Sequence, residues 1–328
     1  MDRILYAVLL AMAVLICTGP LFIPLLSKLR MGQNIRTDGP ATHLKKQGTL
    51  TMGGIMIYLA FAVGALVCCI GKQSFGVMLG GVLFAGGFGL IGFVDDYMKV
   101  HLHRSLGLRA WQKIAGQILL SLGLAFFCYY HPEIGSAVYV PFIRKWWDLG
   151  LFYIPFSVFV SIATVNSTNL LDGLDGLLGG VSSIVFAAMA VISCLMASLL
   201  PDNGTVASVG ILAGAACGAC LGFLRYNVFP ARIIMGDTGS MMIGGAVAFC
   251  AFALRLPLII PIAGMMYLVT SVSDILQLTH LRFFGKRMFR MAPLHHHFEM
   301  AGIPETKIVA MYALVSVVFC LIGILSVM

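Results

Sequence analysis

The chain has 328 residues, of which 60% are hydrophobic and 10% are charged. A soluble domain of this length could not bury so much apolar surface, so the composition excludes a soluble globular protein and indicates an integral membrane protein. The formal net charge of +8 would suggest a nucleic-acid partner in a soluble chain, but in a membrane chain it more often reports orientation or anionic partners, and we expect no nucleic acid.

A helix needs about 20 apolar residues to cross a bilayer. Taken in chain order, ten stretches qualify as candidate spans: roughly 4–26, 50–70, 76–94, 113–130, 151–167, 175–199, 206–224, 238–254, 257–281 and 307–327. They predict an all-α polytopic membrane protein with about ten transmembrane helices, in a single domain that covers residues 1–328. The first stretch is not a typical signal peptide, because it is too long and contains Pro20 and Pro24.

Basic residues gather on one side of the predicted spans. The loops after the first, third, fifth, seventh and ninth spans contain 16 of the 21 Lys and Arg residues. The positive-inside rule therefore places these loops in the cytoplasm and both termini on the extracytoplasmic side. Most of the acids and seven of the eight histidines share the cytoplasmic face, so we expect the site of any polar chemistry there.

The first motif is GFVDDYMKV, residues 92–100, in which Asp95 and Asp96 stand together at the end of an apolar span. One interpretation is a helix end that reaches water, with Asp95 paired to Lys99 one turn later. The other is a carboxylate pair at the membrane boundary, suited to a metal ion or to proton abstraction. Two adjacent acids repel each other, so a nearby cation should relieve them.

The second motif is NSTNLLDGLDGL, residues 166–177, in which polar residues recur at every third position: Asn166, Asn169, Asp172 and Asp175. On one continuous helix they would sweep half of the circumference. We therefore expect them to surround a break between two helices, where Gly173 and Gly176 allow close backbone approach. The segment suits a phosphate, a sugar or a nucleobase, or it is a polar loop with a helix cap.

The third motif is RYNVFPARIIMGDTGS, residues 225–240, which places Asp237 directly before an apolar stretch. Asp237 could simply cap that helix. Alternatively its carboxylate, beside Gly236 and Gly239, is available to a hard cation such as Mg²⁺, which uses one or two carboxylates together with substrate phosphates.

The fourth motif is MAPLHHHFE, residues 291–299. Its three adjacent histidines do not have the spacing of a zinc site. They could bind a phosphate or position a polar substrate, or they could belong to a solvated loop.

Two connecting segments have patterns of their own. The outer segment 132–150 contains the alternating stretch SAVYVPF, which predicts a β-hairpin. Residues 282–290, RFFGKRMFR, alternate basic and aromatic side chains, a pattern that predicts an amphipathic helix on anionic lipid. Asp274, inside the ninth span, is expected to face the protein interior.

Together, GFVDDYMK, NSTNLLDGLDGL, NVFPARIIMGDTGS and APLHHHFE resemble the characteristic segments of the polyprenyl-phosphate N-acetylhexosamine-1-phosphate transferases, across nearly the whole chain. The resemblance implies a multi-pass enzyme of the bacterial plasma membrane that requires Mg²⁺, with its active site on the cytoplasmic face. Its substrates would be undecaprenyl phosphate and a UDP-linked amino sugar. The histidine segment and KKQGTLTMGG favour the branch that uses UDP-N-acetylmuramoyl-pentapeptide.

The resemblance also assigns roles by position. Asp237 becomes the Mg²⁺ ligand, Asp95 binds or deprotonates the lipid phosphate with Asp96 beside it, and His296 joins them in the catalytic set. The nucleoside pocket would comprise Asn169, Asp172, Gly173, Leu174, Asp175 and Asn227. The diphosphate, sugar and peptide side would comprise Lys46, Thr51, Lys99, Lys113, His295 and His297. The predicted substrate-binding set is completed by Asn166, Gly236 and Gln277.

Several alternatives stay open at this point. A related transferase would use UDP-N-acetylglucosamine, and a protein of a different class would transport ions or anions. For the transferase, the lipid phosphate could attack directly, or a covalent aspartyl-phosphate could form first. A homodimer is expected, since members of the family are often dimers, and membrane lipids would surround the spans.

Overall fold

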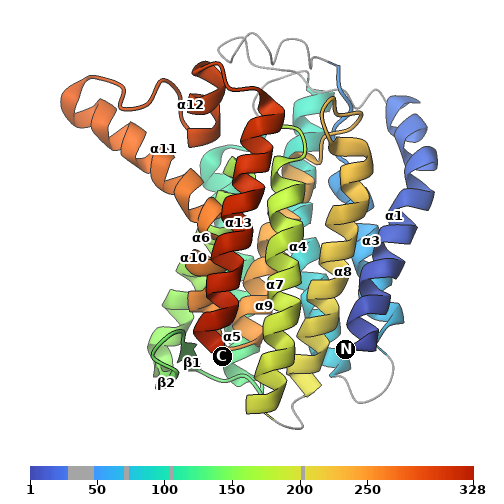
Figure 1. Cartoon of the computed structure of the whole chain (residues 1–328), viewed down its shortest axis with the longest axis vertical. Helices are drawn as coiled ribbons and strands as arrows, with labels where there is room; N and C mark the ends of the chain where they lie inside the picture. The colour runs from blue at the N-terminus through green and yellow to red at the C-terminus, as the bar shows by residue number, and fades with distance from the viewer. Residues whose placement is uncertain (29–47, 70–73, 103–106, 201–203) are drawn as a thin grey trace.

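The computed structural model describes residues 1–28, 48–69, 74–102, 107–200 and 204–328, which form an elongated bundle of helices (Figure 1). Within that part of the chain, seven helical stretches are long and apolar enough to cross a membrane. They are α1 (Asp2–Lys28), α4 (Phe75–His101), α5 (Ala110–Tyr130), η1 with α6 (Gly150–Phe152 and Tyr153–Leu171), α7 (Leu177–Leu199), α8 (Gly204–Asn227) and α13 (Glu305–Val327). The all-α polytopic prediction is consistent with this architecture.

The predicted span 257–281 is not one straight helix. A short 3-10 turn, η2 (Pro257–Ile259), leads into α10 (Ile260–Ala263), and α11 (Met265–Phe284) then leaves at an angle of 80°. Gly264 forms the corner, where an added Cβ would clash with the carbonyl oxygen of Ile260. As a result α11 leans away from the bundle (Figure 1). Counting this bent pair as one span gives eight.

Two other predicted spans are not among these membrane-length stretches. Residues 50–70 contain α3 (Gly54–Val67), a helix of 14 residues, and the predicted span 238–254 corresponds to α9 (Gly236–Ala253), a helix of 18 residues. From Thr238 onward α9 is buried, and it packs mainly against α4 and α6. A helix that is apolar on all sides belongs in the core. The number of ten crossings therefore stays a prediction.

Both chain termini lie at the same end of the bundle (Figure 1). The predicted hairpin is present at that end as β1 (Ala137–Val140) and β2 (Lys145–Asp148), which pair antiparallel. Its turn is fixed to the end of α13, because the backbone N–H of Phe142 donates to the carbonyl oxygen of Ser326 at 2.9 Å. A common end for both termini agrees with an even number of crossings; its extracytoplasmic location stays a prediction.

The segment 282–290 does not form the predicted amphipathic helix. Helix α11 ends at Phe284, and Gly285 adopts a left-handed backbone with φ +66°, the usual way for a helix to terminate. The chain then runs through bends to α12 (Leu294–Met300). The alternating pattern was misleading because it contains its own terminator at Gly285.

Candidate active site

The three motif aspartates Asp95, Asp96 and Asp237 meet where the last turns of α4 lie against the first turn of α9. Asp95 and Asp96 are only 1% and 4% exposed. The close contact depends on Gly92 in α4, since a Cβ at that position would clash with the carbonyl oxygen of Asp237. A glycine one turn before the aspartate pair thus brings acids together that are far apart in the sequence.

Asp95 is held between two lysines. Its Oδ2 lies 2.6 Å from Nζ of Lys99, and its Oδ1 lies 3.2 Å from Nζ of Lys113 on α5. The backbone N–H of Leu108 also donates to Oδ1 at 2.8 Å. The predicted pairing of Asp95 with Lys99 is present, but it is one part of a larger network.

Asp96 has a different set of partners. Its Oδ1 accepts from the backbone N–H of Asp237 at 3.2 Å, and its Oδ2 accepts from the N–H and the hydroxyl of Thr238 at 2.9 and 2.7 Å. These N–H groups belong to the first turn of α9 and have no partner inside the helix. Asp96 therefore caps α9 from a neighbouring helix, at the positive end of its dipole.

Asp237 completes the network. Its Oδ2 accepts from Lys99 at 3.1 Å and from Lys113 at 2.6 Å, and its Oδ1 accepts from the side-chain amide of Asn169 at 3.0 Å. The same amide nitrogen donates to the hydroxyl of Ser240 at 2.9 Å. The second and third sequence motifs thus meet at this carboxylate.

The charges of this acidic cluster (Asp95, Asp96, Asp237, Lys99 and Lys113) do not balance. When all are ionised, three carboxylates against two ammonium groups leave one negative charge. The ligand oxygens of the three aspartates lie within 4.8 Å of one another, and hard divalent cations prefer such oxygens. The cluster can therefore hold a metal ion, and a bound cation would remove the excess charge.

The turn between α6 and α7, residues 172–176, confirms the predicted helix break. Gly176 has φ +79°, and its N–H donates to Oδ1 of Asn227 at 3.0 Å. Oδ2 of Asp175 accepts from the N–H of Ala231 at 2.9 Å, and the N–H of Asp175 donates to Glu305 at 2.5 Å. Leu174 is buried, whereas Asp172 and Gly173 are partly exposed. Many of the hydrogen-bonding groups of this turn therefore maintain the conformation of the turn itself.

Two of the three histidines contact this same turn. A Cβ on Gly173 would meet Nε2 of both His295 and His296, so the imidazoles lie directly against its backbone. Nδ1 of His296 lies 3.1 Å from Glu299. His297 is directed elsewhere, and its Nδ1 accepts from the N–H of Arg290 at 3.1 Å.

The segment before α3 joins the cluster from another direction. Leu50 and Ile233 form a parallel β-bridge, which brings Thr51 beside Gly236. A Cβ on Gly236 would touch both Asp96 and Thr51, so only glycine fits at this position, where φ is +69°. Lys46 lies outside the described residues.

Two predicted substrate residues have protein partners instead. The amide of Asn166 exchanges hydrogen bonds with Gln117, the shorter at 2.8 Å. The amide of Gln277 binds the backbone of Met288 and Phe289 at 2.8 to 3.1 Å. Gln277 thus holds the segment after α11 in place, and both assignments stay predictions.

Sequence reasoning did not identify Thr238, Gln117 and Glu305. Thr238 donates to Asp96 and not to Asp95, so it gives the two aspartates different roles. The only sequence feature that pointed to Thr238 was its position directly after Asp237. Gln117 lies one helical turn after Lys113 on α5, so a helical projection could have found it. Glu305 was assigned only to the polar face, with no partner.

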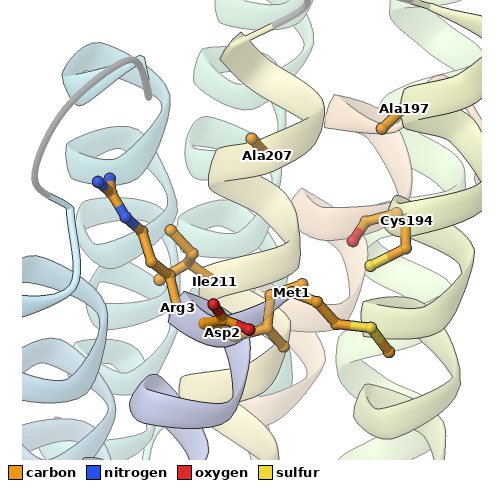
Figure 2. Close-up of a pocket in the computed structure, with 9 residues that line it drawn as sticks. Met1, Asp2, Arg3, Cys194, Ala197, Ala207 and Ile211 are labelled. Carbon is orange, nitrogen blue, oxygen red and sulfur yellow. The ribbon is translucent and has the colours of Figure 1, made fainter.

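The cavity shown in Figure 2 is not this site. It has a volume of about 370 Å³ and is lined by Met1, Asp2, Arg3 and residues of α7 and α8. The hydroxyl of Ser208 on α8 donates to the carbonyl oxygen of Ser74, directly before α4. Asp95 follows 20 residues along α4, or about 30 Å at the helical rise of 1.5 Å per residue. The cavity and the acidic cluster therefore occupy opposite ends of the bundle.

Comparison with known proteins gives a consistent result. A sequence model of glycosyl transferase family 4 matches residues 77–255. A phospho-N-acetylmuramoyl-pentapeptide-transferase of Caldanaerobacter subterraneus subsp. tengcongensis is 45% identical over 325 residues, covering 99% of each chain. Proteins of the same name from Clostridium kluyveri and Heliobacterium modesticaldum are each 43% identical over at least 99% of each chain.

Proposed function

The chain belongs to glycosyl transferase family 4 and, within it, to the phospho-N-acetylmuramoyl-pentapeptide-transferases of peptidoglycan synthesis, and we propose that it makes the first lipid-linked intermediate of that synthesis. It would transfer phospho-N-acetylmuramoyl-pentapeptide from the UDP conjugate to undecaprenyl phosphate. The products are UMP and undecaprenyl-diphosphoryl-N-acetylmuramoyl-pentapeptide, lipid I. Membership of a transferase family favours the enzyme over the transporter.

The observation that carries the proposal is the acidic cluster at one end of membrane-length helices. One substrate is dissolved in lipid and the other in water, so the reaction needs a site where both can arrive. Both substrates are also anionic at the reacting groups. Lys99 and Lys113 contact Asp95 and Asp237, and with a divalent cation bound the cluster would carry the net positive charge that such groups require.

The proposed reaction is a single displacement at phosphorus. An oxygen of the lipid phosphate forms a bond to the β-phosphorus of the nucleotide, and the bond from that phosphorus to the bridging oxygen breaks, so UMP leaves with this oxygen. The lipid phosphate needs no strong base, since a second phosphate pKa is about 6. The protein's part is positioning and charge neutralisation.

Asp95 would orient the lipid phosphate. A covalent route would instead need one aspartate oxygen to attack phosphorus. The oxygens of Asp95 are engaged by Lys99, Lys113 and the N–H of Leu108, and the side chain is 1% exposed. This enclosure favours direct transfer. Single-turnover reactions without lipid acceptor test the point: a trapped phospho-enzyme would establish the covalent route.

The donor set of the cluster fits Mg²⁺, which takes oxygen ligands and retains waters for substrate phosphates. Asp237 would hold it, and of the other two carboxylates Asp95 would be the more available because Asp96 is committed to α9. When bound, the ion supplies charge to the diphosphate. Asn169 holds Asp237 in orientation through its Oδ1, which leaves Oδ2 facing the lysines.

The remaining substrate groups are assigned to the neighbouring elements. The nucleoside would lie against the α6–α7 turn, at Asp172 and Gly173, while Asp175 and Asn227 keep that turn in shape. His295 and His296, which contact the same turn, would serve the diphosphate and sugar. We further propose that this end faces the cytoplasm of a bacterial plasma membrane, and that the enzyme is a homodimer.

Transfer of labelled sugar phosphate to undecaprenyl phosphate in detergent tests the function. We expect lipid product and UMP in equal amounts with Mg²⁺ and UDP-N-acetylmuramoyl-pentapeptide, and none with chelator. UDP-N-acetylglucosamine should fail as donor. Efficient use of that donor would instead support the N-acetylglucosamine branch, and solute flux into vesicles without UMP release would contradict a transferase.

A further inference from the structure

The β1–β2 hairpin carries a patch of large apolar side chains that no part of the described chain covers. The patch comprises Phe142, Ile143 and Trp147 of the hairpin with Leu151 and Phe152 of η1, each between 61% and 76% exposed. Every residue of β2 is exposed, including its two adjacent tryptophans. In a strand, neighbouring side chains point to opposite faces: Trp146 packs against Tyr139 and Arg255, whereas Trp147 on the other face is the more exposed of the two.

The hairpin is nevertheless fixed to the bundle. The N–H of Tyr139 donates to the carbonyl oxygen of Arg255 at 2.8 Å, and that of Phe142 donates to Ser326 at 2.9 Å. The guanidinium of Arg255 lies 4.3 Å from the ring centre of Trp146, a cation–π distance. The apolar side chains are therefore presented on a rigid support, and their exposure is not that of a loose loop.

The charged side chains at the tip of the hairpin are both basic. Arg144 and Lys145 are exposed in and after the turn. Asp148 lies at the other end of β2, where it accepts from the hydroxyl of Ser136 at 2.6 Å and from the N–H of Gly150 at 3.0 Å. The tip thus combines aromatic side chains with free positive charge, the composition of protein surfaces at a bilayer interface.

The position of the hairpin also indicates a location at the bilayer interface. The membrane-length stretch Gly150–Leu171 begins two residues after Asp148, and Leu151 and Phe152 within it continue the patch. A hairpin tied this closely to the start of a span lies at the level of the lipid headgroups. We propose that the hairpin lies within the headgroup layer at the terminal end of the bundle, with Trp147, Phe142 and Ile143 in the upper acyl region and Arg144 and Lys145 bound to anionic phospholipid.

The chain offers its own probes, because it has three tryptophans and the third, Trp111, begins α5 at the opposite end. The variant Trp111→Phe leaves the hairpin intact and restricts fluorescence to Trp146 and Trp147. It would be reconstituted in vesicles of phosphatidylcholine and phosphatidylglycerol that carry nitroxide-labelled lipid. We expect nitroxides near the top of the acyl chain to quench at least twofold more than nitroxides at its end, and iodide to quench weakly.

Two further variants assign the signal. Adding Trp147→Phe should remove most of the quenching. Adding Arg144→Gln and Lys145→Gln should abolish any excess quenching by labelled phosphatidylglycerol over labelled phosphatidylcholine, which we expect to be about twofold in the parent. If iodide quenches the tryptophans of the Trp111→Phe protein fully and lipid nitroxides do not, the hairpin stands in water and is free for a protein partner, and the proposal is wrong. Equal quenching by the two lipids in the parent would overturn the anionic preference.

Discussion

Two polar regions at the same end of the bundle use their groups in opposite ways. At the α6–α7 turn, Asp175 and the last residue of α8, Asn227, bind backbone groups of the turn and of the α8–α9 connection. In the acidic cluster, Asp95 and Asp237 share two lysines instead. The polar groups of the turn are bound by neighbouring backbone and side chains, whereas the cluster, with all five groups ionised, would carry one negative charge in excess.

The comparison distinguishes polar groups that maintain the fold from polar groups that take part in the reaction. Buried polar groups that bind backbone amides fix the fold, and removing one leaves its partner unsatisfied at a cost of about 1–3 kcal/mol. Carboxylates that are bound mainly by charged side chains can exchange partners when a charged ligand arrives. We therefore expect substitutions in the cluster to reduce turnover, and substitutions in the turn to reduce stability and nucleotide affinity.

The largest effect should come from Asp237→Asn or Asp95→Asn. Each removes a charge that neutralises Lys99 and Lys113, and we expect turnover to fall at least a hundredfold while the protein still folds. The matched control is Asp148→Asn in the hairpin, which is exposed and lies at the other end; its turnover should stay near that of the parent. Near-normal activity of either cluster variant would remove that residue from the site.

His296→Ala tests whether the histidines belong with the cluster or with the turn they contact. We expect His296 to act in the reaction together with the cluster, so His296→Ala should lower turnover at least a hundredfold and leave the melting temperature unchanged. His297→Ala is the companion variant, since His297 is directed toward Arg290; its loss should be smaller. A fall in stability without loss of turnover would assign His296 to the turn.

Asp96→Asn separates the two adjacent aspartates. Asp96 accepts two N–H bonds and one hydroxyl bond from α9. The side-chain nitrogen of an asparagine is itself a donor, so it could not accept from the group that it faces. We expect the free energy of unfolding to fall by about 1–3 kcal/mol, measured by thermal unfolding in detergent. Asp95→Asn should lose less stability, because Asp95 accepts only one backbone N–H, that of Leu108, and does not cap α9. Equal stability of the two variants would refute the capping role.

Asn227→Ala should give the smallest loss of turnover. The change leaves the N–H of Gly176 and the carbonyl oxygen of Ile233 without their bonds, which should lower stability by about 1–3 kcal/mol and raise the KM for the nucleotide. The exposed Ser198→Ala, whose hydroxyl binds its own helix, serves as control. A collapse of kcat would mean that the turn takes part in the chemistry directly.

The sequence predicted most membrane-length helices, the hairpin and the helix break at Gly176, because apolar runs, alternation and glycine are local signals. It missed the 80° corner at Gly264, since apolar residues continue directly on both sides of this glycine. It placed the acids on one face but could not separate Asp95 from Asp96. The donors that separate them are 141 and 142 residues away on α9, and only the packing of α4 on α9 at Gly92 brings them close.

The shared location of the two termini (Figure 1) means that a tag at either end lies away from the acidic cluster. A reporter fused to either end samples the same compartment, so a fluorescent protein and a phosphatase at the two ends should give matching topology readings. A protein tethered to a sensor surface by either end presents its acidic cluster to the flowing solution. Nucleotide binding can then be followed without the support blocking the site.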